Sequence, residues 1–307
     1  MYDLIIIGGG PAGITAGIYA ARQRLKTLLV TKEFGGQIAK KAVAIENYPG
    51  FKEITGPELL EKFEDHLRSQ DIEIKIGEVI KVEKPAETFE LTTSENEKFE
   101  SMAVIVATGA DPRPLEVPGE KEFIGKGVGY CVTCDGPLFK NKNVAIIGGG
   151  NAGFEAAIFM NEYANKVYIL EFGAEVKADQ RNQSIAQKRE KIEVITNAAV
   201  KEIKGETFVS SLVYEDQKTK EIKEIELQGV FVEIGYQPAT SFVKGLVDFG
   251  KMDEIKAEPE TFKTKTEGLY AVGDTNEGVY KQIITACGEG CKAALNASAY
   301  VFNMKNK

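Results

Sequence analysis

Hydrophobic and polar positions repeat one pattern at residues 2–22 and again at residues 142–162. In each copy an apolar run, LIII or VAII, reaches the stretch GGG, and small and apolar residues then follow at helical spacing. A buried strand, a tight turn and a helix produce this pattern. The chain therefore contains one strand-turn-helix unit twice, which predicts two similar α/β domains.

Three further apolar runs end at a glycine and indicate how the two domains are connected. The runs VIVATGADP from Val104 and VFVEIGYQP from Val230 are similar, so each predicts a later strand of its own domain. The run GLYAVGD at 268–274 has no glycine-rich partner, so we expect it to return the chain to the first domain. The second domain is then an insertion, with linkers near 111–120 and 244–250. The predicted boundaries are 1–112 and 246–307 for the first domain and 113–245 for the second.

The segments between these runs predict one more helix and two small groups of antiparallel strands. Leu59, Leu60, Phe63 and Leu67 recur at helical spacing and form a core face. The stretches at 72–84 and 87–100 alternate and predict a small meander beside the main sheet, and the stretch at 210–229 predicts a hairpin with a charged turn.

Composition narrows the class of protein. The 307 residues are 43% hydrophobic and 27% charged, and no apolar run approaches the roughly 18 residues that span a bilayer, so we expect a soluble protein. A strand begins almost at Met1 without a secretory leader, so we expect a cytoplasmic location. The net charge of −8 and the pI near 5.1 argue against a nucleic-acid partner, which needs a basic face.

The two glycine-rich turns have the spacing of dinucleotide-binding fingerprints. One such motif is a weak signal, but two copies, each between a predicted strand and a predicted helix, are a strong one. Each glycine has a separate task, and the helix N-terminus then binds the pyrophosphate. Gly8 and Gly148 allow the tight turn, Gly10 and Gly150 let the backbone approach the pyrophosphate, and Gly13 and Gly153 let the helix pack on the strand.

The stretch GYCVTCDGPLF at 129–139 places Cys131 and Cys134 three positions apart. A zinc site would need two more ligands, and the sequence offers only Cys287, Cys291 and His66. A structural disulfide that closes so small a loop stabilises little. In general a CxxC pair activates one thiol and keeps the second within reach, as reversible thiol-disulfide exchange requires. We therefore favour a redox-active pair over a structural disulfide or zinc, and we expect no metal.

An FAD-type fingerprint, a nicotinamide-type fingerprint and CVTCD between them resemble the low-molecular-weight thioredoxin reductase family of flavoprotein disulfide reductases. The resemblance covers essentially the whole chain and rests on GGGPAG, FGGQI, IENYPG, VATGA, CVTCDGPLFKNK, GGGNAG, GLYAVGD and YKQIITACGEGCKAAL. The stretch LEFGAEVKADQ is most similar to the reductase portion of the alkyl hydroperoxide reductase flavoprotein subunit. This resemblance implies two Rossmann-like, three-layer domains, with the nicotinamide domain, which carries the CxxC pair, inserted into the FAD domain.

The same resemblance implies a function and partners. It implies a flavoenzyme of cell redox homeostasis that passes electrons from NAD(P)H through FAD and the CxxC pair to a protein disulfide. The hydroperoxide reductase protein carries N-terminal thioredoxin-like domains that this sequence lacks, so we expect a separate small dithiol protein, thioredoxin or a similar carrier, as partner. Relatives are homodimers, and the resemblance implies a homodimer here.

The FAD contacts are implied by position along the first domain. One departure concerns the end of the second strand, where the expected ribose-binding acid is replaced by Thr31 or Lys32, with Glu33 just beyond. The implied contacts are Gly8, Gly10, Pro11, Ala12, Gly13, Thr31, Lys32, Gly35, Gly36, Gln37, Asn47, Val82, Ala107, Thr108, Gly109, Gly273, Asp274, Lys281, Gln282 and Ile283.

The nicotinamide site departs from the family in a way that bears on the choice of cofactor. NADPH-dependent relatives carry a His-Arg-Arg cluster where this chain has Glu171, and an acid there hydrogen-bonds a free ribose 2′-hydroxyl. A 2′-phosphate would meet repulsion of roughly 4 kcal/mol at about 4 Å and an effective dielectric of about 20, although Lys177 and Arg181 downstream could soften it. We therefore predict NADH over NADPH. The implied contacts are Gly148, Gly150, Asn151, Ala152, Gly153 and Glu171.

The resemblance also divides the chemical work. It makes Cys134 the thiol that meets the flavin and Cys131 the thiol that attacks the partner, and the neighbouring Asp135 can handle the proton that disulfide reduction consumes. Since the cysteines lie in the nicotinamide domain, we expect that domain to rotate about the linkers near 111–118 and 244–250. Two alternatives stay open: a ferredoxin-fed reductase with a non-functional nicotinamide site, in which Glu171 only ends a surface strand, and an NADH oxidase or peroxidase.

Overall fold

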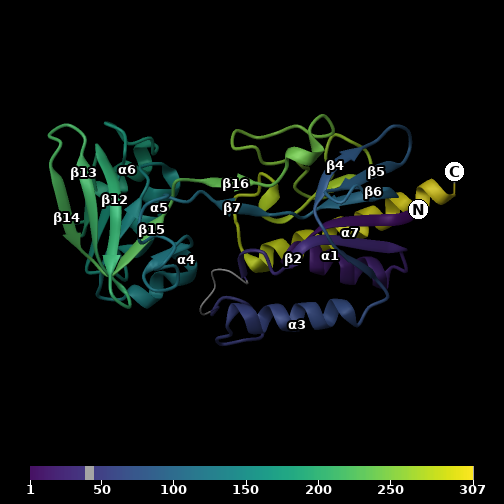
Figure 1. Ribbon diagram of the computed structural model, residues 1–307, viewed down its shortest axis with the longest axis horizontal. Coiled ribbons are helices and arrows are strands. Elements are labelled where there is room, and N and C mark those ends of the chain that lie inside the picture. The colour runs from purple at the N-terminus through teal and green to yellow at the C-terminus, as the bar shows by residue number, and fades with distance from the viewer. Residues whose placement is uncertain (39–44, 307) are drawn as a thin grey trace. The chain divides into compact units, whose positions relative to one another are not determined.

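The structure, a computed structural model, describes residues 1–38 and 45–306 (Figure 1). The chain divides into two compact units. Of the described residues, unit 1 comprises 1–38, 48–111 and 237–306, and unit 2 comprises 45–47 and 112–236. The first crossing lies within one residue of the predicted boundary, but the second lies at 236/237 and not at 245/246. The difference arises because Val243 and Val247 are buried in a core cluster of unit 1.

Unit 1 is built on a parallel sheet that a small antiparallel meander extends. The β-branched runs form its centre, and GLYAVGD supplies a strand beside β6, which confirms that this stretch returns to the first sheet. The order is β3-β2-β1-β6-β5-β4, with β17 also pairing with β6. The strands are β1 (Tyr2–Gly9), β2 (Thr27–Phe34), β3 (Glu73–Ile76), β4 (Val79–Glu83), β5 (Phe89–Thr93), β6 (Lys98–Val106) and β17 (Leu269–Ala271).

One prediction for this sheet was wrong in part. The stretch 72–84 was expected to belong wholly to the meander, but β3 pairs in parallel with β2, Leu29 opposite Ile74, and so lies at the edge of the parallel sheet. Only β4, β5 and the first half of β6 form the antiparallel meander. Gly77 and Glu78 separate the parallel strand β3 from the antiparallel strand β4. Alternation of side chains is the same in both strands, so it does not distinguish a parallel edge strand from a strand of the meander.

The faces of the unit 1 sheet are covered by different layers. Side chains alternate along β1, so Leu4 and Ile6 pack with α1 (Pro11–Arg22) and α7 (Ile283–Lys305), which run side by side. Ile5 and Ile7 pack on the opposite face against the meander. Helix α3 (Gly56–Arg68) is labelled in Figure 1. Its predicted core face is confirmed, since Leu59 and Leu67 are fully buried and Leu60 and Phe63 pack on the core as partly buried residues.

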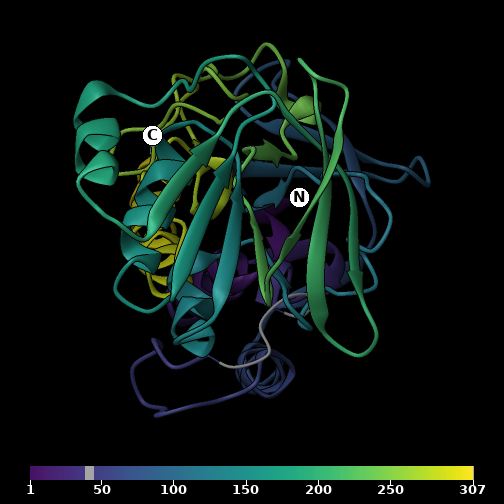
Figure 2. The ribbon, with the colours of Figure 1, turned by 90° about the vertical axis from the view of Figure 1, so that its left-hand side faces the viewer.

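Unit 2 repeats this design with a five-stranded, wholly parallel sheet of order β11-β10-β9-β15-β8. A three-stranded antiparallel sheet, β12-β13-β14, contains the hairpin predicted at 210–229 (Figure 2). The parallel strands are β8 (Val128–Gly129), β9 (Asn143–Ile147), β10 (Lys166–Leu170), β11 (Ile192–Ile195) and β15 (Gly229–Val232), and the antiparallel strands are β12 (Ala198–Gly205), β13 (Val209–Asp216) and β14 (Ile222–Glu226).

The faces of the unit 2 sheet are also covered on both sides. Val144 and Ile146 of β9 pack against helix α5 (Asn151–Met160), whereas Ala145 and Ile147 pack against the antiparallel sheet. Helix, parallel sheet and antiparallel sheet therefore form three layers in each unit, and the predicted α/β fold with two Rossmann-like domains is confirmed. Between residues 45 and 306 the structure also contains helices α4 (Val132–Asp135) and α6 (Gln180–Gln187), with 3-10 turns η1 (Gly136–Phe139), η2 (Ser241–Val243) and η3 (Gly273–Thr275).

The two crossings between the units are paired with each other. β7 (Ala110–Pro112) and β16 (Tyr236–Pro238) form a two-stranded sheet. The pairing is extended by the Arg113 N–H, which donates to the Gly235 carbonyl at 2.9 Å, and by the Ala239 N–H, which donates to the Gly109 carbonyl at 3.4 Å. The chain therefore leaves unit 1 and returns to it along one short ribbon.

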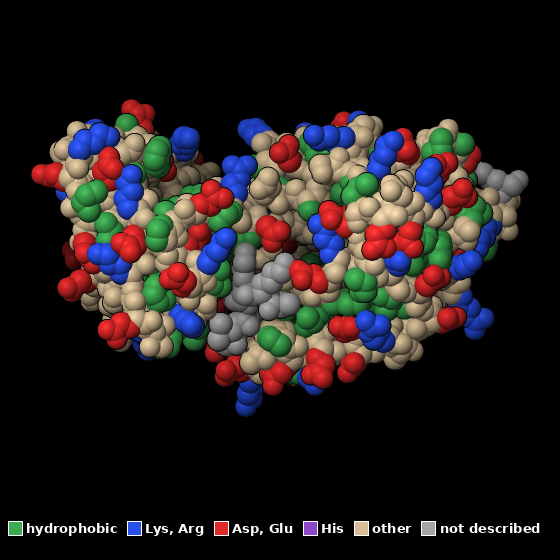
Figure 3. Space-filling model, in the orientation of Figure 1, with side chains coloured by type: hydrophobic (Ala, Val, Ile, Leu, Met, Phe, Trp, Pro, Cys, Tyr) green, Lys and Arg blue, Asp and Glu red, His purple; other side chains and the backbone are tan. Residues whose placement is uncertain are grey.

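The surface carries mixed charge. Basic and acidic side chains alternate over the face in view, and acidic side chains gather where α3 is exposed (Figure 3). Within the described ranges, no helix combines the length and the apolar character that a membrane crossing requires.

Candidate functional site

The first glycine-rich turn joins β1 to α1 in unit 1. Gly8 has φ of +117°, and an ideal Cβ on it would lie 2.3 Å from the Ala107 carbonyl oxygen. A Cβ on Gly13 would lie 1.9 Å from the Gly8 carbonyl oxygen, so neither position accepts a side chain. A Cβ on Gly10 would meet nothing within 4 Å, so the protein itself does not require a glycine there. A glycine at an open position is what the close approach of a ligand to the backbone requires.

The second turn, between β9 and α5, has nearly the same geometry. Gly148 has φ of +124° and its Cβ would lie 2.4 Å from the Glu233 carbonyl oxygen, while that of Gly153 would lie 1.9 Å from the Gly148 carbonyl oxygen. Gly150 again faces open space. The two units therefore present one open glycine each at the start of a helix.

The helices that begin at predicted cofactor contacts differ from α3 and α6 in their N-terminal caps. The side chain of Thr55 caps α3 in a reciprocal arrangement with Glu58, and Asp179 caps α6. In contrast, α1, α5 and α7 begin after Gly10, Gly150 and Gln282 without a side-chain cap and without an acid in the first turn. Their first N–H groups keep a partial positive charge that suits an anion or an electron-rich ligand edge. FAD and a nicotinamide dinucleotide fit these three helix ends.

A buried polar cluster follows β17 in unit 1. Burial raises the pKa of Asp274, although Lys281 opposes the shift, and the Asp274 carboxylate forms no hydrogen bond or ion pair within the described part of the chain. The Lys281 ammonium donates to the carbonyls of Asp274 at 3.1 Å and Asn276 at 2.5 Å, and burial lowers its pKa. Asp274 is therefore held in place through its backbone, and its carboxylate is available to a hydroxyl-bearing ligand.

Glu289 supports that cluster and was not predicted from the sequence. Its carboxylate accepts hydrogen bonds of 2.7 Å from the Gly273 N–H and of 2.7 Å from the Asn276 side chain. Burial raises the pKa of Glu289. The only signal in the sequence is one acid among the small residues of ACGEGCKAAL, which periodicity does not distinguish from a surface acid.

The strand register identifies which residue of β2 occupies the place of Glu171. Ile7 lies opposite Val30 in unit 1, and Ile147 lies opposite Leu170 in unit 2, so Thr31 is the counterpart of Glu171. Thr31 is buried and its hydroxyl donates to the Glu33 carbonyl at 2.6 Å, while Lys32 is exposed and forms an ion pair with Glu78 at 2.7 Å. Neither side chain supplies the carboxylate that usually binds an adenosine ribose.

The other predicted FAD contacts do not all lie together. Gly36 has φ of +52°, and the Gln37 side chain donates to the Ala110 carbonyl at 3.1 Å and the Asp111 carboxylate at 2.5 Å. Val82 lies on β4 with its side chain in the core, which leaves only its backbone for a ligand. Asn47 groups with unit 2 and not with the other contacts. The remaining predicted contacts, Pro11, Ala12, Gly35, Ala107, Thr108, Gly109, Gln282 and Ile283, lie in unit 1 at the ends of β1, β2 and β6 or the start of α1 and α7.

Glu171 lies at the end of β10 beside the second glycine-rich turn. Its carboxylate accepts hydrogen bonds of 2.7 Å from the Gly149 N–H and of 2.7 Å from the Gly173 N–H, and the residue is half-buried. The side chain is thus oriented by backbone and does not simply end a strand in solvent. Asn151 accepts a hydrogen bond of 2.7 Å from the Asp179 N–H, and Lys177 donates its N–H to the Gly149 carbonyl at 2.8 Å, so the loop after Glu171 folds back on the turn.

Cys131 and Cys134 form a disulfide with a Cα–Cα distance of 5.3 Å. Cys131 follows β8 and precedes α4, and its carbonyl accepts from the N–H groups of Cys134 at 3.2 Å and Asp135 at 3.0 Å. Cys134 is exposed and Cys131 is half-buried. Burial raises the pKa of Asp135 to about 6, which places a protonatable carboxyl beside the pair.

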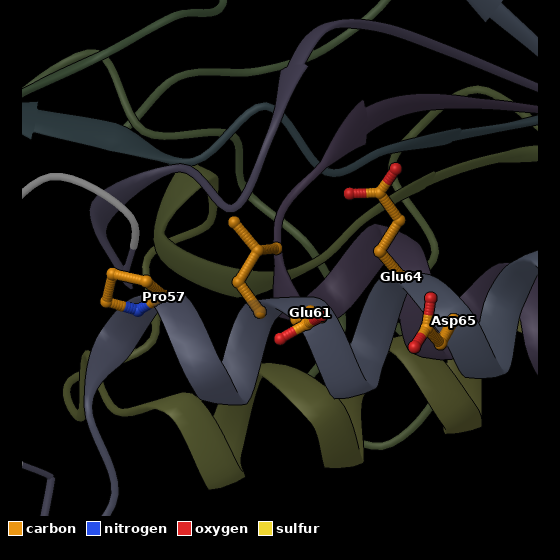
Figure 4. A pocket seen from close by; sticks show the side chains of 5 residues that line it. Pro57, Glu61, Glu64 and Asp65 are labelled. Atoms are coloured by element: carbon orange, nitrogen blue, oxygen red, sulfur yellow. The ribbon is translucent and has the colours of Figure 1, made fainter.

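Three further features are a carboxyl of unit 2 with a raised pKa, two free cysteines of unit 1 and a hollow on the surface of α3. Burial raises the pKa of Glu233, at the end of β15, to about 7. Cys287 and Cys291 lie in α7 of unit 1 as free cysteines, and the Cys287 thiol approaches the Tyr48 hydroxyl at 4.0 Å. A shallow hollow beside α3 is lined by Pro57, Leu60, Glu61, Glu64 and Asp65, all from one helix and none of them a predicted site residue (Figure 4).

Comparisons with known proteins agree with this geometry. A family model described as pyridine nucleotide-disulphide oxidoreductase matches residues 2–290. The chain is 42% identical over 300 residues to a protein of Bacillus subtilis named NADH dehydrogenase, and the match covers 98% of this chain and 58% of that protein. An alkyl hydroperoxide reductase subunit of Staphylococcus aureus is 42% identical over 301 residues, with 98% of this chain and 59% of that protein covered. The chain thus spans less than two thirds of the length of these curated relatives.

A solved structure matches over almost the full length of both chains. Thioredoxin reductase from Streptococcus pyogenes has a TM-score of 0.93 and 35% sequence identity, and the match covers 99% of each chain. The two glycine-rich turns, the inserted unit and the CxxC disulfide are thus accounted for by one family. The chain belongs to the pyridine nucleotide-disulphide oxidoreductase family, within its thioredoxin reductase-like flavoproteins.

Proposed function

We propose that this chain passes electrons from NADH, by way of bound FAD and the Cys131–Cys134 disulfide, to the disulfide of a small dithiol protein such as thioredoxin. The observation that carries the proposal is the disulfide itself, closed within CxxC directly after the edge strand of the sheet that bears the second glycine-rich turn. The names of the relatives, a thioredoxin reductase and a hydroperoxide reductase, support a disulfide as the electron acceptor.

FAD would bind in unit 1. Bound FAD would take up two electrons from the reduced nicotinamide and release them to the disulfide. Gly10 and the uncapped start of α1 would bind its pyrophosphate, and the Asp274 carboxylate would bind hydroxyls of its ribityl chain. The start of α7 at Gln282 and Ile283 would stabilise negative charge on the flavin ring.

NADH is the proposed donor because of Glu171. Its carboxylate is fixed by two backbone N–H groups at 2.7 Å beside the open Gly150, the arrangement that reads a ribose 2′-hydroxyl. The printed name of the Bacillus subtilis relative, NADH dehydrogenase, agrees with this choice. Lys177 is near enough to the turn through its backbone to weaken the discrimination against NADPH, so we propose a preference and not an exclusion.

The two cysteines and Asp135 would perform the exchange. The reduced pair would begin with the Cys131 thiolate, which attacks one sulfur of the partner disulfide, breaks that bond and forms a mixed disulfide. The Cys134 thiolate would then attack Cys131, release the partner as a dithiol and re-form the 131–134 bond. Asp135, protonated below a pKa of about 6, would donate or accept the proton that accompanies these steps.

The order of the cysteines can be tested by trapping. The greater exposure of Cys134 would favour Cys134 as the attacking thiol, whereas the family resemblance assigns that role to Cys131. With a thioredoxin variant that lacks its resolving cysteine and carries thionitrobenzoate in a mixed disulfide on its remaining cysteine, Cys134→Ser should displace thionitrobenzoate and accumulate an enzyme–thioredoxin disulfide, and Cys131→Ser should not. The reverse result would exchange the two roles without removing the proposed reaction.

A rotation of unit 2 about the crossings would let the flavin meet the cysteines and the nicotinamide in turn. The paired β7 and β16 are the segments on which such a hinge would turn, so we move the second proposed hinge from 244–250 to 236–238. A covalent crosslink between the two units should stop turnover and leave FAD bound. Undiminished turnover of the crosslinked protein would rule the rotation out.

The decisive experiment is an anaerobic titration of the FAD-loaded protein, with flavin absorbance followed as NADH or NADPH is added. Fast bleaching by NADH and weak bleaching by NADPH is the expected result. Bleaching by neither would contradict the proposed donor and favour ferredoxin. NADH oxidation by oxygen or peroxide at an unchanged rate in Cys134→Ser would instead favour an oxidase or peroxidase, for which the name NADH dehydrogenase of one relative is the supporting observation.

A further inference from the structure

A buried carboxylate outside the predicted site lies close to the redox disulfide in sequence. Glu120 is 1% exposed, and its two oxygens accept hydrogen bonds of 2.7 Å from the Leu115 N–H, of 2.7 Å from the Glu116 N–H and of 2.7 Å from the Tyr130 hydroxyl. A carboxylate is rarely buried unless such donors satisfy it. Glu116 has φ of +61°, a left-handed conformation that is unusual for a residue other than glycine. Glu120 thus stabilises an unfavourable turn in the segment that enters unit 2.

Tyr130 connects this carboxylate to the disulfide. It immediately precedes Cys131, its ring is 8% exposed and packs in the core of unit 2, and burial raises the pKa of its hydroxyl. Its main-chain carbonyl accepts a hydrogen bond of 3.2 Å from the Tyr236 hydroxyl. Tyr236 begins β16, the segment that leaves unit 2. Tyr130 is therefore tied through Glu120 to the entering segment and directly to the leaving segment.

The secondary structure around the disulfide does little to hold it. β8 has only two residues and is an edge strand, and α4 is a single turn that begins after Cys131. Short edge strands are among the less stable parts of a sheet, because they form few ladder hydrogen bonds. Tyr130 and Cys131 lie between these two short elements, so side-chain contacts must fix their backbone.

We propose that Glu120 and Tyr130 are positioning residues that fix the Cys131–Cys134 loop relative to the paired segments that enter and leave unit 2. The proposal rests on the proposed disulfide reductase function. Under this proposal the disulfide moves together with these segments and keeps its position relative to them. Loss of the network lets the loop shift relative to the segments, while the nicotinamide site stays intact.

Tyr130→Phe tests the proposal because it removes one hydroxyl and leaves the ring and the two backbone donors to Glu120. In the FAD-loaded protein, flavin reduction by NADH should stay within about twofold of wild type. Turnover with thioredoxin should fall roughly tenfold in kcat, with KM for thioredoxin unchanged, as loss of one hydrogen bond to a charged group predicts. Amide hydrogen exchange at Cys134 and Asp135 should become roughly tenfold faster, with no change in β9.

Tyr214→Phe is the matched control. Tyr214 is 6% exposed on β13 of the same unit, and its hydroxyl makes no hydrogen bond within the described residues, so this variant should match wild type in every measurement. Equal behaviour of Tyr130→Phe and Tyr214→Phe in both turnover and exchange would overturn the proposal.

A second variant and the hydrogen-exchange measurement test the positioning role of Glu120 and Tyr130 separately from the proposed disulfide reductase function. Glu120→Gln removes the charge and replaces one of the two accepting oxygens with an amide NH₂ group, so it should reproduce the faster exchange at Cys134, and wild-type exchange in this variant would also count against the network. If the wild-type protein fails to reduce thioredoxin, the proposed function fails. The exchange results for Tyr130→Phe would still decide whether Glu120 and Tyr130 hold the loop.

Discussion

The two units share one sheet framework and differ in what they place at its edge. Matching β1 with β9 aligns β6 with β15, and the edge strands β17 and β8 then correspond, with Tyr270 at the level of Gly129. In this register Cys131 falls at the level of Val272, so unit 2 carries its disulfide where unit 1 carries the Gly273–Asp274 turn. The same scaffold thus places the Asp274 carboxylate in one copy and a disulfide in the other at the carboxyl ends of parallel strands, where ligands bind in open α/β sheets.

Substitutions at these corresponding positions should have the largest effects, on thioredoxin reduction in unit 2 and on FAD binding in unit 1. Cys134→Ser should abolish reduction of thioredoxin while FAD binding and flavin reduction by NADH remain as in wild type, because no resolving thiol is left. Asp274→Ala should instead weaken FAD binding by roughly 10- to 100-fold, since it removes a hydrogen-bond acceptor that is charged. Flavin retention after gel filtration and thioredoxin turnover are the two measurements. Cys291→Ser, a half-buried free cysteine in α7, is the control.

The raised pKa of Asp135, beside the disulfide of unit 2, should make the stability of the protein depend on pH. Its folded-state pKa of about 6 lies above the usual 3.8, so folding takes up a proton between these values, and the ionised form is disfavoured in the fold. The free energy of unfolding of wild type should therefore fall, relative to Asp135→Asn, as pH rises from about 4 to about 7, by up to about 3 kcal/mol. Urea unfolding of both proteins at about pH 4 and about pH 7.5 measures this difference. A constant difference would show that burial does not perturb Asp135.

Alanine substitutions at the open glycines test whether a cofactor approaches the backbone, without adding strain to the fold. Gly10→Ala and Gly150→Ala meet no protein atom within 4 Å and have φ of −83° and −86°, so the thermal midpoint should hardly change. Affinity should fall roughly tenfold or more for FAD in the first variant and for NADH in the second, because the new methyl group occupies the path of the pyrophosphate. Gly8→Ala and Gly148→Ala are the contrast, since both must strain the fold itself by about 1–3 kcal/mol. Unchanged affinities in the first pair would place the cofactors elsewhere.

Glu171→Gln should have the smallest effect. It removes the charge but keeps one acceptor for the Gly149 and Gly173 N–H groups, so the turn should stay folded. The ratio of kcat/KM for NADH to that for NADPH should fall roughly tenfold, mainly through better use of NADPH. Thr31 is the counterpart in unit 1, so Thr31→Val should leave this ratio unchanged. An unaltered ratio in Glu171→Gln would remove Glu171 as the residue that reads the ribose.

Local sequence signals predicted much of this arrangement, and the errors share one cause. The glycine turns, the β17 run and the CxxC pair are short motifs with fixed spacing, so they could be recognised without the fold. The role of β3 and the second crossing could not, because they depend on which distant sheet accepts Ile74 and which core accepts Val243. Glu120, Glu233 and Glu289 were missed because a buried acid and a surface acid have the same local pattern, and only tertiary contacts distinguish them.

The pairing of β7 with β16 bears on how such a protein could have arisen. The backbones of Arg113 and Gly235 are joined by a hydrogen bond of 2.9 Å, so the two ends of the segment 112–236 are neighbours. A module whose ends meet can be inserted into a host loop, or cut out of it, without pulling the host apart. On these grounds a polypeptide of residues 112–236 should fold alone, and unit 1, closed by a short turn between Asp111 and Gln237, should keep its own sheet.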